Sequence, residues 1–304
     1  MKGLLIILLF LTELPASAQL FPISDFYIFN GLIINPAFAG SQDALSTALQ
    51  YRNQWTGFND APKITIFSAH APLFTDRMGL GFFLARHSFG IYKATSFMGN
   101  YAYRMNLYNG KLSFGIAFGI TSNRASWSDL KATDPDDILL TERSSPVYIP
   151  NFSIGTYYTG KNYFAGISLP FFLTHEPDDN SGKYTVTNKP DNYNYFITGG
   201  YTFSLSPYLS LQPSVLLKYY AQTHIQTDIF FQAEVYDRFS MGAGYRSTGM
   251  LMGLISCNVN KQFKVSYSYD SDSGKAGKYK KGSHEIMIGY IFRYTRNVMS
   301  PAEI

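Results

Sequence analysis

The chain has few charged residues and no long apolar segment. Asp, Glu, Lys and Arg together make up 15% of its 304 residues, whereas a typical soluble domain contains about 25%. No uninterrupted apolar run reaches the roughly 20 residues that a membrane-spanning helix requires, and the mean hydropathy is -0.08. These absences exclude a bundle of membrane helices and fit an ordinary soluble domain poorly.

Cysteine and clustered basic charge are also scarce. The single cysteine, Cys257, excludes an intrachain disulfide framework. The basic residues are scattered and the formal net charge is only +4. The sequence therefore lacks the clustered basic residues that nucleic-acid binding requires. Aromatic residues, by contrast, make up 17% of the chain. A membrane barrel places such residues at the level of the lipid headgroups.

The first 43 residues contain no strand pattern. Residues 1–18 have a basic start, an apolar core at 4–11 and the small residues Ala16-Ser17-Ala18, which is the organisation of a secretory signal peptide. We expect cleavage before Gln19. Residues 19–43 contain turn sequences at Asn30-Gly31 and at 35–40. Two placements fit them: a periplasmic segment that enters the barrel mouth as a plug, or a flexible tether.

From residue 44 onward, apolar residues alternate with polar or small ones. Within 111–121, Phe114, Ile116 and Phe118 share one parity, whereas Gly115 and Ala117 share the other. Period two is that of a β-strand, and the segments approach the roughly 9–11 residues of a membrane strand. The pattern predicts an all-β fold: a transmembrane antiparallel β-barrel of about 14 strands over residues 44–294, with a periplasmic C-terminal tail at 295–304. The expected strands are 44–54, 63–72, 77–87, 93–106, 111–121, 151–159, 162–171, 194–205, 208–219, 228–236, 238–246, 250–258, 262–269 and 284–294.

The expected connections alternate between short turns and longer polar loops. This sorting is typical of outer-membrane barrels, whose short turns are periplasmic, and it places both chain ends in the periplasm. We expect 246–249 to be the shortest outer loop. A barrel of this size is too wide for its own side chains to fill, so water, infolded loops or the N-terminal segment must occupy the lumen.

Arg52 is the first candidate functional residue. It has the parity of Ser46, Ala48 and Gln50, and on the lipid face near the midplane an arginine would cost about 2–4 kcal/mol. Arg52 is therefore expected to face the lumen, either to contact a partner or cargo segment or to join a polar network that holds the wall or plug. The remaining charges expected in the lumen are of mixed sign and dispersed: Arg104, Lys218, Glu234, Arg246, Lys264 and Glu285.

Neither catalysis nor metal binding has a supporting pattern. The five histidines, at 70, 87, 175, 224 and 284, lack ligand spacing. Ser283, His284 and Glu285 are consecutive in an expected strand, so their side chains point to alternate faces and cannot converge. The acidic run at 134–137 lacks the other residues of a calcium loop. We expect no catalytic residue, no metal and no cofactor.

Several motifs resemble those of the PorP/SprF family. Asn35-Pro36-Ala37-Phe38-Ala39-Gly40 is similar to the family pattern N-P-A-x-x-G. Arg52-Asn53-Gln54-Trp55 is similar to R-x-Q-W, and Pro62-Lys63-Ile64-Thr65 follows with a pattern close to P-x-T. The C-terminal hairpin, with Tyr269-Asp270 and Gly282-Ser283-His284-Glu285, is similar to the family's last hairpin. The resemblance covers nearly the whole chain after residue 18.

This resemblance implies an outer-membrane protein of the type IX secretion system and gliding machinery. Its implied partners are secretion-system proteins, such as periplasmic ring components, or the C-terminal domain of a secreted adhesin, together with outer-membrane lipid. The resemblance directs attention to Asn35, Pro36, Gly40, Gln54, Trp55 and Pro62 in addition to Arg52, Arg104 and Glu285. Residues 35–40 are either a docking segment or a turn into the first strand, and Trp55 is either an interfacial anchor or a ligand platform. A channel for small solutes is the alternative function.

Overall fold

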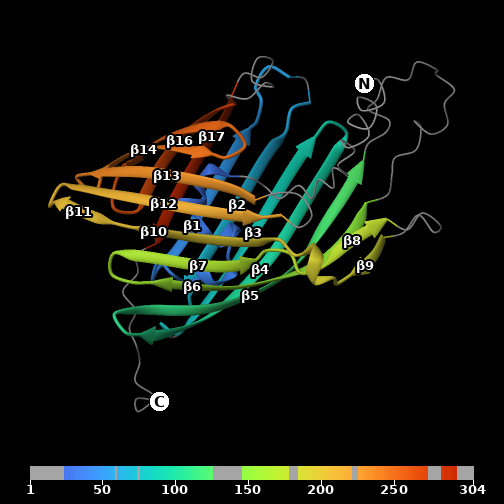
Figure 1. The fold of residues 1–304 in the computed structure, drawn as a ribbon, viewed down its shortest axis with the longest axis horizontal. Helices are drawn as coiled ribbons and strands as arrows, with labels where there is room; N and C mark the ends of the chain where they lie inside the picture. The colour runs from blue at the N-terminus through green and yellow to red at the C-terminus, as the bar shows by residue number, and fades with distance from the viewer. Residues whose placement is uncertain are drawn as a thin grey trace, which may run out of the picture.

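The computed structural model describes residues 24–58, 60–73, 76–125, 146–177, 184–220, 225–272 and 282–292. These residues form a closed antiparallel β-barrel of fourteen strands (Figure 1). Each wall strand pairs with the next wall strand along the chain, β7 with β10 across the β8–β9 hairpin, and the pairings of β1 with β17 and of β10 with β12 complete the ring. None of the helices among the described residues is long and apolar enough to cross a membrane.

The strands follow one another around the wall, with β10 and β11 forming one strand interrupted at Thr202. A separate hairpin of β8 (Thr174–Pro177) and β9 (Tyr184–Thr187) lies in the connection between β7 and β10. The wall strands are β1 (Leu45–Asn53), β2 (Lys63–Pro72), β3 (Met78–Phe89), β4 (Tyr92–Leu107), β5 (Gly110–Ala125), β6 (Val147–Thr159), β7 (Tyr163–Leu169), β10 (Tyr195–Tyr201), β11 (Phe203–Ser206), β12 (Leu209–Tyr219), β13 (Ile225–Val235), β14 (Phe239–Arg246), β15 (Met250–Asn258), β16 (Phe263–Asp272) and β17 (Ser283–Phe292).

The predicted all-β barrel is confirmed. The strand limits predicted from the sequence differ from the observed ones most at β5 and β6, which extend to Ala125 and begin at Val147. Polar residues end the apolar alternation there, yet Asn123 still pairs with Val147. The expectation that 246–249 is the shortest outer loop is wrong, because only Gly90 and Ile91 join β3 to β4.

The connections define two rims. One rim, here called the short-turn rim, carries 73–77, 108–109, 160–162, 207–208, 236–238 and 259–262; the other, the long-loop rim, carries 54–62, 90–91, 126–146, 170–194, 220–224, 247–249 and 273–282. The predicted signal peptide, the acidic run 134–137, His224 and the tail 295–304 lie outside the described residues.

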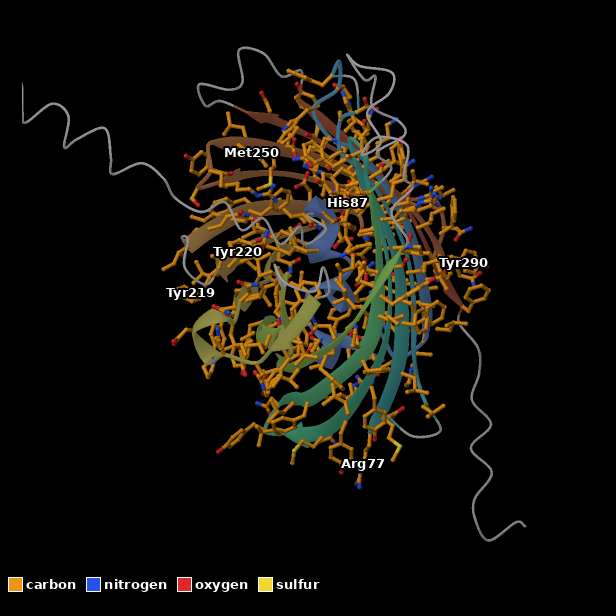
Figure 2. All side chains as sticks on the ribbon, turned by 90° about the vertical axis from the view of Figure 1, so that its right-hand side faces the viewer. Arg77, His87, Tyr219, Tyr220, Met250 and Tyr290 are labelled. Carbon is orange, nitrogen blue, oxygen red and sulfur yellow. The ribbon has the colours of Figure 1, made fainter. Side chains whose placement is uncertain are left out.

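The two faces of the wall differ as the alternation predicts. On β5, Phe114, Ile116 and Phe118 are about half exposed on the outer face, whereas Ala117 between them is 5% exposed. Aromatic side chains are frequent on the outer face, and Figure 2 shows Tyr219 and Tyr290 directed away from the barrel. An outer surface of exposed apolar residues is the surface that lipid covers in a membrane barrel.

Residues 24–43, here called the inner segment, lie inside the barrel (Figure 1). They form three short 3-10 helices: η1 (Asp25–Ile28), η2 (Gly31–Ile33) and η3 (Pro36–Phe38). The Ser24 hydroxyl accepts from the Phe26 N–H at 3.1 Å and so caps η1. The Asn35 carboxamide oxygen caps η3 by accepting from the Ala37 N–H at 2.9 Å. These caps satisfy backbone donors that would otherwise be buried without a partner.

Apolar side chains of the inner segment complete the core of the barrel. Phe26 packs in a cluster with residues of β13, β15 and β17, and Ile33 packs in one with residues of β2 to β5. Leu32, Ala37 and Phe38 form a third cluster with Ala102 and Tyr157. The segment therefore fills space that the wall side chains leave open.

The inner segment runs through the lumen from one rim to the other. Ser24 contacts Glu285, the third residue of β17, at the long-loop rim. Asp43 contacts Arg104 and Lys111 at the short-turn rim. The sequence left two placements open, a plug that enters the barrel mouth or a flexible tether. In the structure the segment crosses the lumen, with Ser24 at the long-loop rim and Asp43 at the short-turn rim.

We predict that Gly115→Ala disturbs the packing of the inner segment. A Cβ at Gly115 would lie 2.1 Å from the Ala37 nitrogen, so the backbone of η3 must move. Overpacking of this kind typically costs about 1–3 kcal/mol, and the midpoint of heat-induced barrel opening, followed by gel mobility, is expected to fall. Gly253→Ala is the matched control, because its Cβ would meet nothing closer than 3.9 Å. Equal midpoints for the two variants would contradict the packing described here.

Candidate functional site

The main polar feature of the lumen is a set of buried charges around Asp25. One carboxylate oxygen of Asp25 lies 2.7 Å from Arg52 Nη1, and the other lies 3.1 Å from Arg246 Nη2. The Ser268 hydroxyl donates to the first oxygen at 3.2 Å. Each of the three charged side chains is 2% exposed. Asp25 thus joins the inner segment to β1, β14 and β16.

Arg52 also contacts two carboxylates of the wall. It lies 3.1 Å from Glu285, which is its direct partner in the pairing of β1 with β17, and it forms a close ion pair with Asp270 of β16. Glu285 accepts from the Asp25 N–H at 2.9 Å and lies 2.6 Å from the Ser24 hydroxyl. Arg52 and Glu285 therefore hold both the side chain and the backbone at the start of η1.

The Arg246 side is built in a similar way. Arg246 binds Asp228 through two nitrogens, at 2.9 and 3.1 Å. Lys218 Nζ lies 3.1 Å from the same carboxylate, and the Gln226 amide donates to it at 2.9 Å. Buried charges are stable only when they are paired and hydrogen-bonded, and both conditions are met here. We call the seven charged residues the ion cluster: Asp25, Arg52, Lys218, Asp228, Arg246, Asp270 and Glu285.

Asp25 is the only member of the ion cluster that the wall does not supply. The cluster contains four carboxylates and three basic groups, so the wall by itself supplies three of each. The two arginines, at 2.7 and 3.1 Å from its carboxylate oxygens, compensate the buried charge of Asp25.

Uncharged contacts hold the middle of the inner segment. The Asn30 amide donates to the Ser68 hydroxyl at 2.8 Å, and the Asn35 amide donates to the Thr156 carbonyl at 2.9 Å. The Ser168 hydroxyl donates to the Ile34 carbonyl at 2.6 Å. These bonds reach β2, β6 and β7, so the segment is fixed across the barrel.

The last residues of the segment are fixed at the short-turn rim. The Gly40 N–H donates to His70 Nδ1 at 3.2 Å, and Arg104 donates to the Gly40 carbonyl. Gly40 has a φ of 73°, a conformation that favours glycine. A Cβ at this position would also lie 2.8 Å from the Cα of Gly79. The chain can turn from η3 towards β1 here because no side chain is present.

The structure brings together only some of the residues that the sequence singled out. Arg52 and Glu285 meet in the ion cluster. Asn35, Pro36 and Gly40 lie within the buried inner segment, and Arg104 binds its end. The sequence predicted dispersed lumenal charges, which is wrong for Arg52, Lys218 and Arg246, because their strands end at the same rim and the carboxylates of Asp25 and Asp228 bridge them.

Gln54, Trp55 and Pro62 lie apart from the ion cluster, in the β1–β2 connection at the long-loop rim. The Gln54 N–H donates to the Pro62 carbonyl at 2.9 Å, and the Trp55 N–H donates to the Ser283 hydroxyl at 3.3 Å. Trp55 has a φ of 52°, which is uncommon for a bulky residue. This connection is therefore a defined structure that touches the start of β17.

Sequence reasoning missed Asp25 and Asp228. Asp228 lies in β13 with the parity of the inward residues Phe230 and Gln232, so alternation could have placed it in the lumen. Asp25 could not be placed in this way, because it lies in a segment whose sequence lacks the alternation of apolar and polar residues. Among the described residues, no group of three or more His, Cys, Asp or Glu is arranged to hold a metal ion.

A protein-family model described as type IX secretion system membrane protein PorP/SprF matches residues 16–290. The chain belongs to the PorP/SprF family. The resemblance found in its motifs is therefore confirmed, and the ion cluster and inner segment are features of a PorP/SprF-family outer-membrane barrel. No curated protein matches this chain.

The toluene transporter TbuX shares the barrel architecture of this PorP/SprF-family protein. The toluene transporter TbuX of Ralstonia pickettii has a TM-score of 0.53 and 10% identity, and the match covers 87% of this chain and 93% of the transporter. The outer-membrane protein Omp33 of Acinetobacter baumannii has a TM-score of 0.48 and 6% identity, with 83% and 99% covered. At these identities the likeness concerns the fold alone.

We predict that Asp25→Asn loosens the inner segment while the wall remains closed. The remaining ion cluster has three carboxylates and three basic groups, so the strands keep their partners. The segment loses charge-assisted hydrogen bonds worth about 1.5–3 kcal/mol. In a Cys257→Ser background, a cysteine replacing Leu32, which is 1% exposed, should react with a water-soluble maleimide roughly tenfold faster or more in the Asp25→Asn variant.

Asp43→Asn is the control for this experiment. Asp43 also pairs with a wall arginine, but its side chain is 57% exposed, and exposed pairs contribute little. Its labelling rate should stay close to that of the parent. Equal acceleration by both substitutions would show that Asp25 has no special role in holding the segment.

Proposed function

We propose that this PorP/SprF-family barrel is a non-enzymatic component of the type IX secretion and gliding machinery that binds protein partners at its rims. The partners are other secretion-system proteins or the C-terminal domain of a secreted adhesin. The observation that carries the proposal is the inner segment, which occupies the lumen and is bonded to the wall at both rims. A partner segment would have to displace the inner segment to pass through the barrel, so we place partner binding at the loops and turns.

We place the long-loop rim at the cell surface and the short-turn rim in the periplasm, which is the usual orientation of outer-membrane barrels. In this orientation β17 ends on the periplasmic side. An adhesin would meet the long-loop rim, where the β1–β2 connection contains Gln54 and Trp55. Periplasmic components would meet the short-turn rim, where Tyr108 is 95% exposed and Tyr236 is 66% exposed.

A pull-down from gently solubilised outer membranes tests the proposal. We expect the tagged barrel to recover either a large secreted protein or periplasmic secretion components, identified by mass spectrometry. Gln54→Ala with Trp55→Ala should reduce recovery of a secreted protein, whereas Tyr108→Ala with Tyr236→Ala should reduce recovery of periplasmic components. Each double variant is the control for the other, since both keep the inner segment. Recovery of the barrel alone would count against the proposal.

A channel for small solutes is the alternative function, and conductance separates it from the proposed one. A lumen occupied by the inner segment should give no stable current steps in a planar bilayer. Reproducible open-channel currents from the unmodified protein would favour the channel and contradict a closed barrel.

A further inference from the structure

One strand of the wall continues past the end of its neighbour at the short-turn rim. β10 pairs with β7 as far as Tyr201, which lies opposite Tyr163, and the Thr202 N–H then donates to the Asn162 carbonyl at 2.6 Å. The chain of β7 turns away there, whereas β11 continues. Among the described strands, only β12 pairs with β11. Figure 1 shows the β11–β12 hairpin extending beyond the β6–β7 turn.

The edge of β11 that faces away from β12 has backbone groups without a described strand partner. The Thr202 N–H points towards β7, and alternate residues of a strand point their backbone groups to the same side. The N–H and the carbonyl of Ser204 therefore also point away from β12. Exposed edges are commonly protected by charged residues or proline, and β11, with the sequence Phe-Ser-Leu-Ser, contains neither. Such an edge can accept a further strand.

This edge is short, so side chains must supply most of the binding energy. The register of β11 against β12 shifts between Ser204 and Ser206. Exposed side chains lie on β11 and on the two neighbouring turns, and Leu205 among them is 59% exposed. We call four of these exposed residues the rim patch: Phe203, Leu205, Tyr208 and Tyr236.

The two tyrosines of the rim patch are held together. The centroids of their rings lie 5.0 Å apart, and the Tyr236 N–H donates to the Tyr208 carbonyl at 2.8 Å. Tyr236 has a φ of 56° and Asp237 has a φ of 51°, values that favour Asn and Gly in a turn. A bulky residue in this conformation costs stability. Folding alone would favour asparagine at position 236, so the cost points to a role of the ring in binding.

The rim patch extends beyond the lipid-facing part of the wall. Tyr163 and Tyr201 are exposed, lie opposite each other and belong to the aromatic residues that end the outer face. Leu205 lies four residues past Tyr201, which is about 13 Å further along the strand. A protein of the aqueous phase can therefore reach Leu205.

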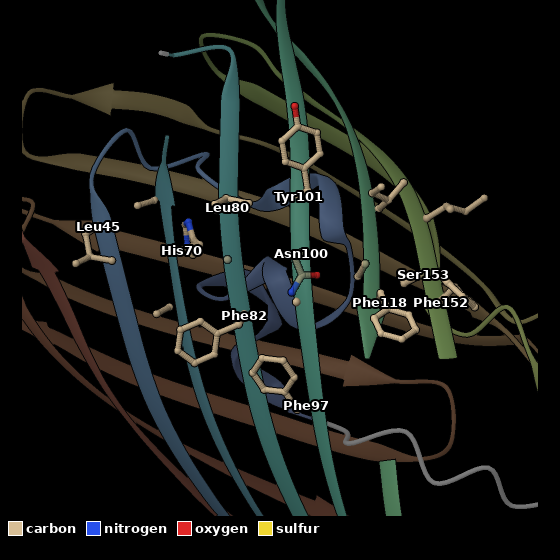
Figure 3. Close-up of a pocket in the computed structure, with 17 residues that line it drawn as sticks. Leu45, His70, Leu80, Phe82, Phe97, Asn100, Tyr101, Phe118, Phe152 and Ser153 are labelled. Atoms are coloured by element: carbon tan, nitrogen blue, oxygen red, sulfur yellow. The ribbon is translucent and has the colours of Figure 1, made fainter. Parts of the chain in front are cut away.

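An apolar hollow of about 720 Å³ on the outer wall differs in this respect. Figure 3 shows Phe82 beside Phe97 and Phe118 beside Phe152 at this hollow. These residues lie on the lipid-facing surface of β3 to β6, away from the strand ends at the short-turn rim. The hollow therefore faces lipid, whereas the rim patch faces water.

The gaps in the described chain at the short-turn rim lie away from the rim patch. They follow Leu73 in the β2–β3 connection and Phe292 at the end of β17. Around the ring, β2, β3 and β17 are each at least five strands from the strand that β10 and β11 form. Both neighbours of that strand, β7 and β12, are described.

We propose that the edge of β11 and the rim patch bind an extended segment of a periplasmic partner, which joins the barrel as an added strand. This inference rests on the proposed function, in which the short-turn rim meets periplasmic secretion components. The edge sets the direction and register of the segment through backbone hydrogen bonds. Side chains alternate between the two faces of a strand, so apolar residues at alternate positions of the segment lie beside Phe203 and Leu205.

Retention of periplasmic proteins by the immobilised full-length barrel tests the added strand. The probe is the periplasmic fraction of the same cells, and each retained protein is quantified by mass spectrometry. Ser204→Pro removes the N–H on the open edge and leaves the pairing with β12, because proline is tolerated where the N–H of an edge strand faces solvent. We expect it to reduce retention of a secretion component roughly tenfold. Ser204→Ala is the matched control, because it removes the hydroxyl and keeps the N–H, and it should retain the component fully.

Tyr236→Asn tests the rim patch separately. Asparagine suits the conformation of the turn, so the variant should fold at least as stably as the unmodified barrel, as judged by the heat-induced change in gel mobility. It should nevertheless retain the component roughly tenfold less, because an aromatic anchor is lost. A residue with a purely structural role would not separate stability from retention in this way.

A photo-crosslinker identifies the bound segment. Leu205→p-benzoylphenylalanine should form an adduct with an uncharged segment of the retained component that has apolar residues at alternate positions. An adduct with residues 293–304 or with a second copy of the barrel overturns the proposal, as does equal retention by Ser204→Pro and Ser204→Ala. If the unmodified barrel retains no secretion component, the proposed function fails as well. If it retains one and the Ser204→Pro and Tyr236→Asn variants retain it equally well, only the added strand fails.

Discussion

The carboxylate of Asp25 is the interaction on which the interior of this barrel depends. A ring of fourteen strands encloses more space than its own side chains fill, and its wall places Arg52 and Arg246 inside that space. Both arginines have wall carboxylates as partners, but among the described residues only Asp25 bonds to both, at 2.7 and 3.1 Å. The inner segment thus supplies the missing volume and also links the β1, β16 and β17 part of the ion cluster with the β12 to β14 part.

This arrangement separates the role of the lumen from the role of the surface. The inner segment is bonded at both rims and along its length, and its apolar side chains pack against the inner face of the wall. The surfaces that remain for other molecules are the loops, the short turns and the outer wall.

Alternation predicted most of the fold because each strand has one lipid face and one inner face, and the inner position of Arg52 and Glu285 follows from parity alone. The alternation shows which face of a strand a residue lies on, but it does not show which strand ends lie close together once the barrel closes. Arg246 and Arg52 are far apart in sequence and lie on strands that do not pair, so their convergence on one residue was not predictable. Asp25 lies in a 3-10 helix whose sequence has no strand alternation. Its partners Arg52 and Arg246 come together only when the barrel is closed.

The most direct test of the central claim is a disulfide between the inner segment and the wall. In a Cys257→Ser background, Asn30→Cys is combined with Ser68→Cys. These two side chains are hydrogen-bonded inside the barrel, with 2.8 Å between Asn30 Nδ2 and Ser68 Oγ. We expect mild oxidation to join them readily. Asn30→Cys combined with Phe67→Cys should remain unjoined, because Phe67 faces the lipid. Failure of the first pair to form a disulfide in the folded barrel, or equal reaction of both pairs, would contradict a lumen occupied by residues 24–43.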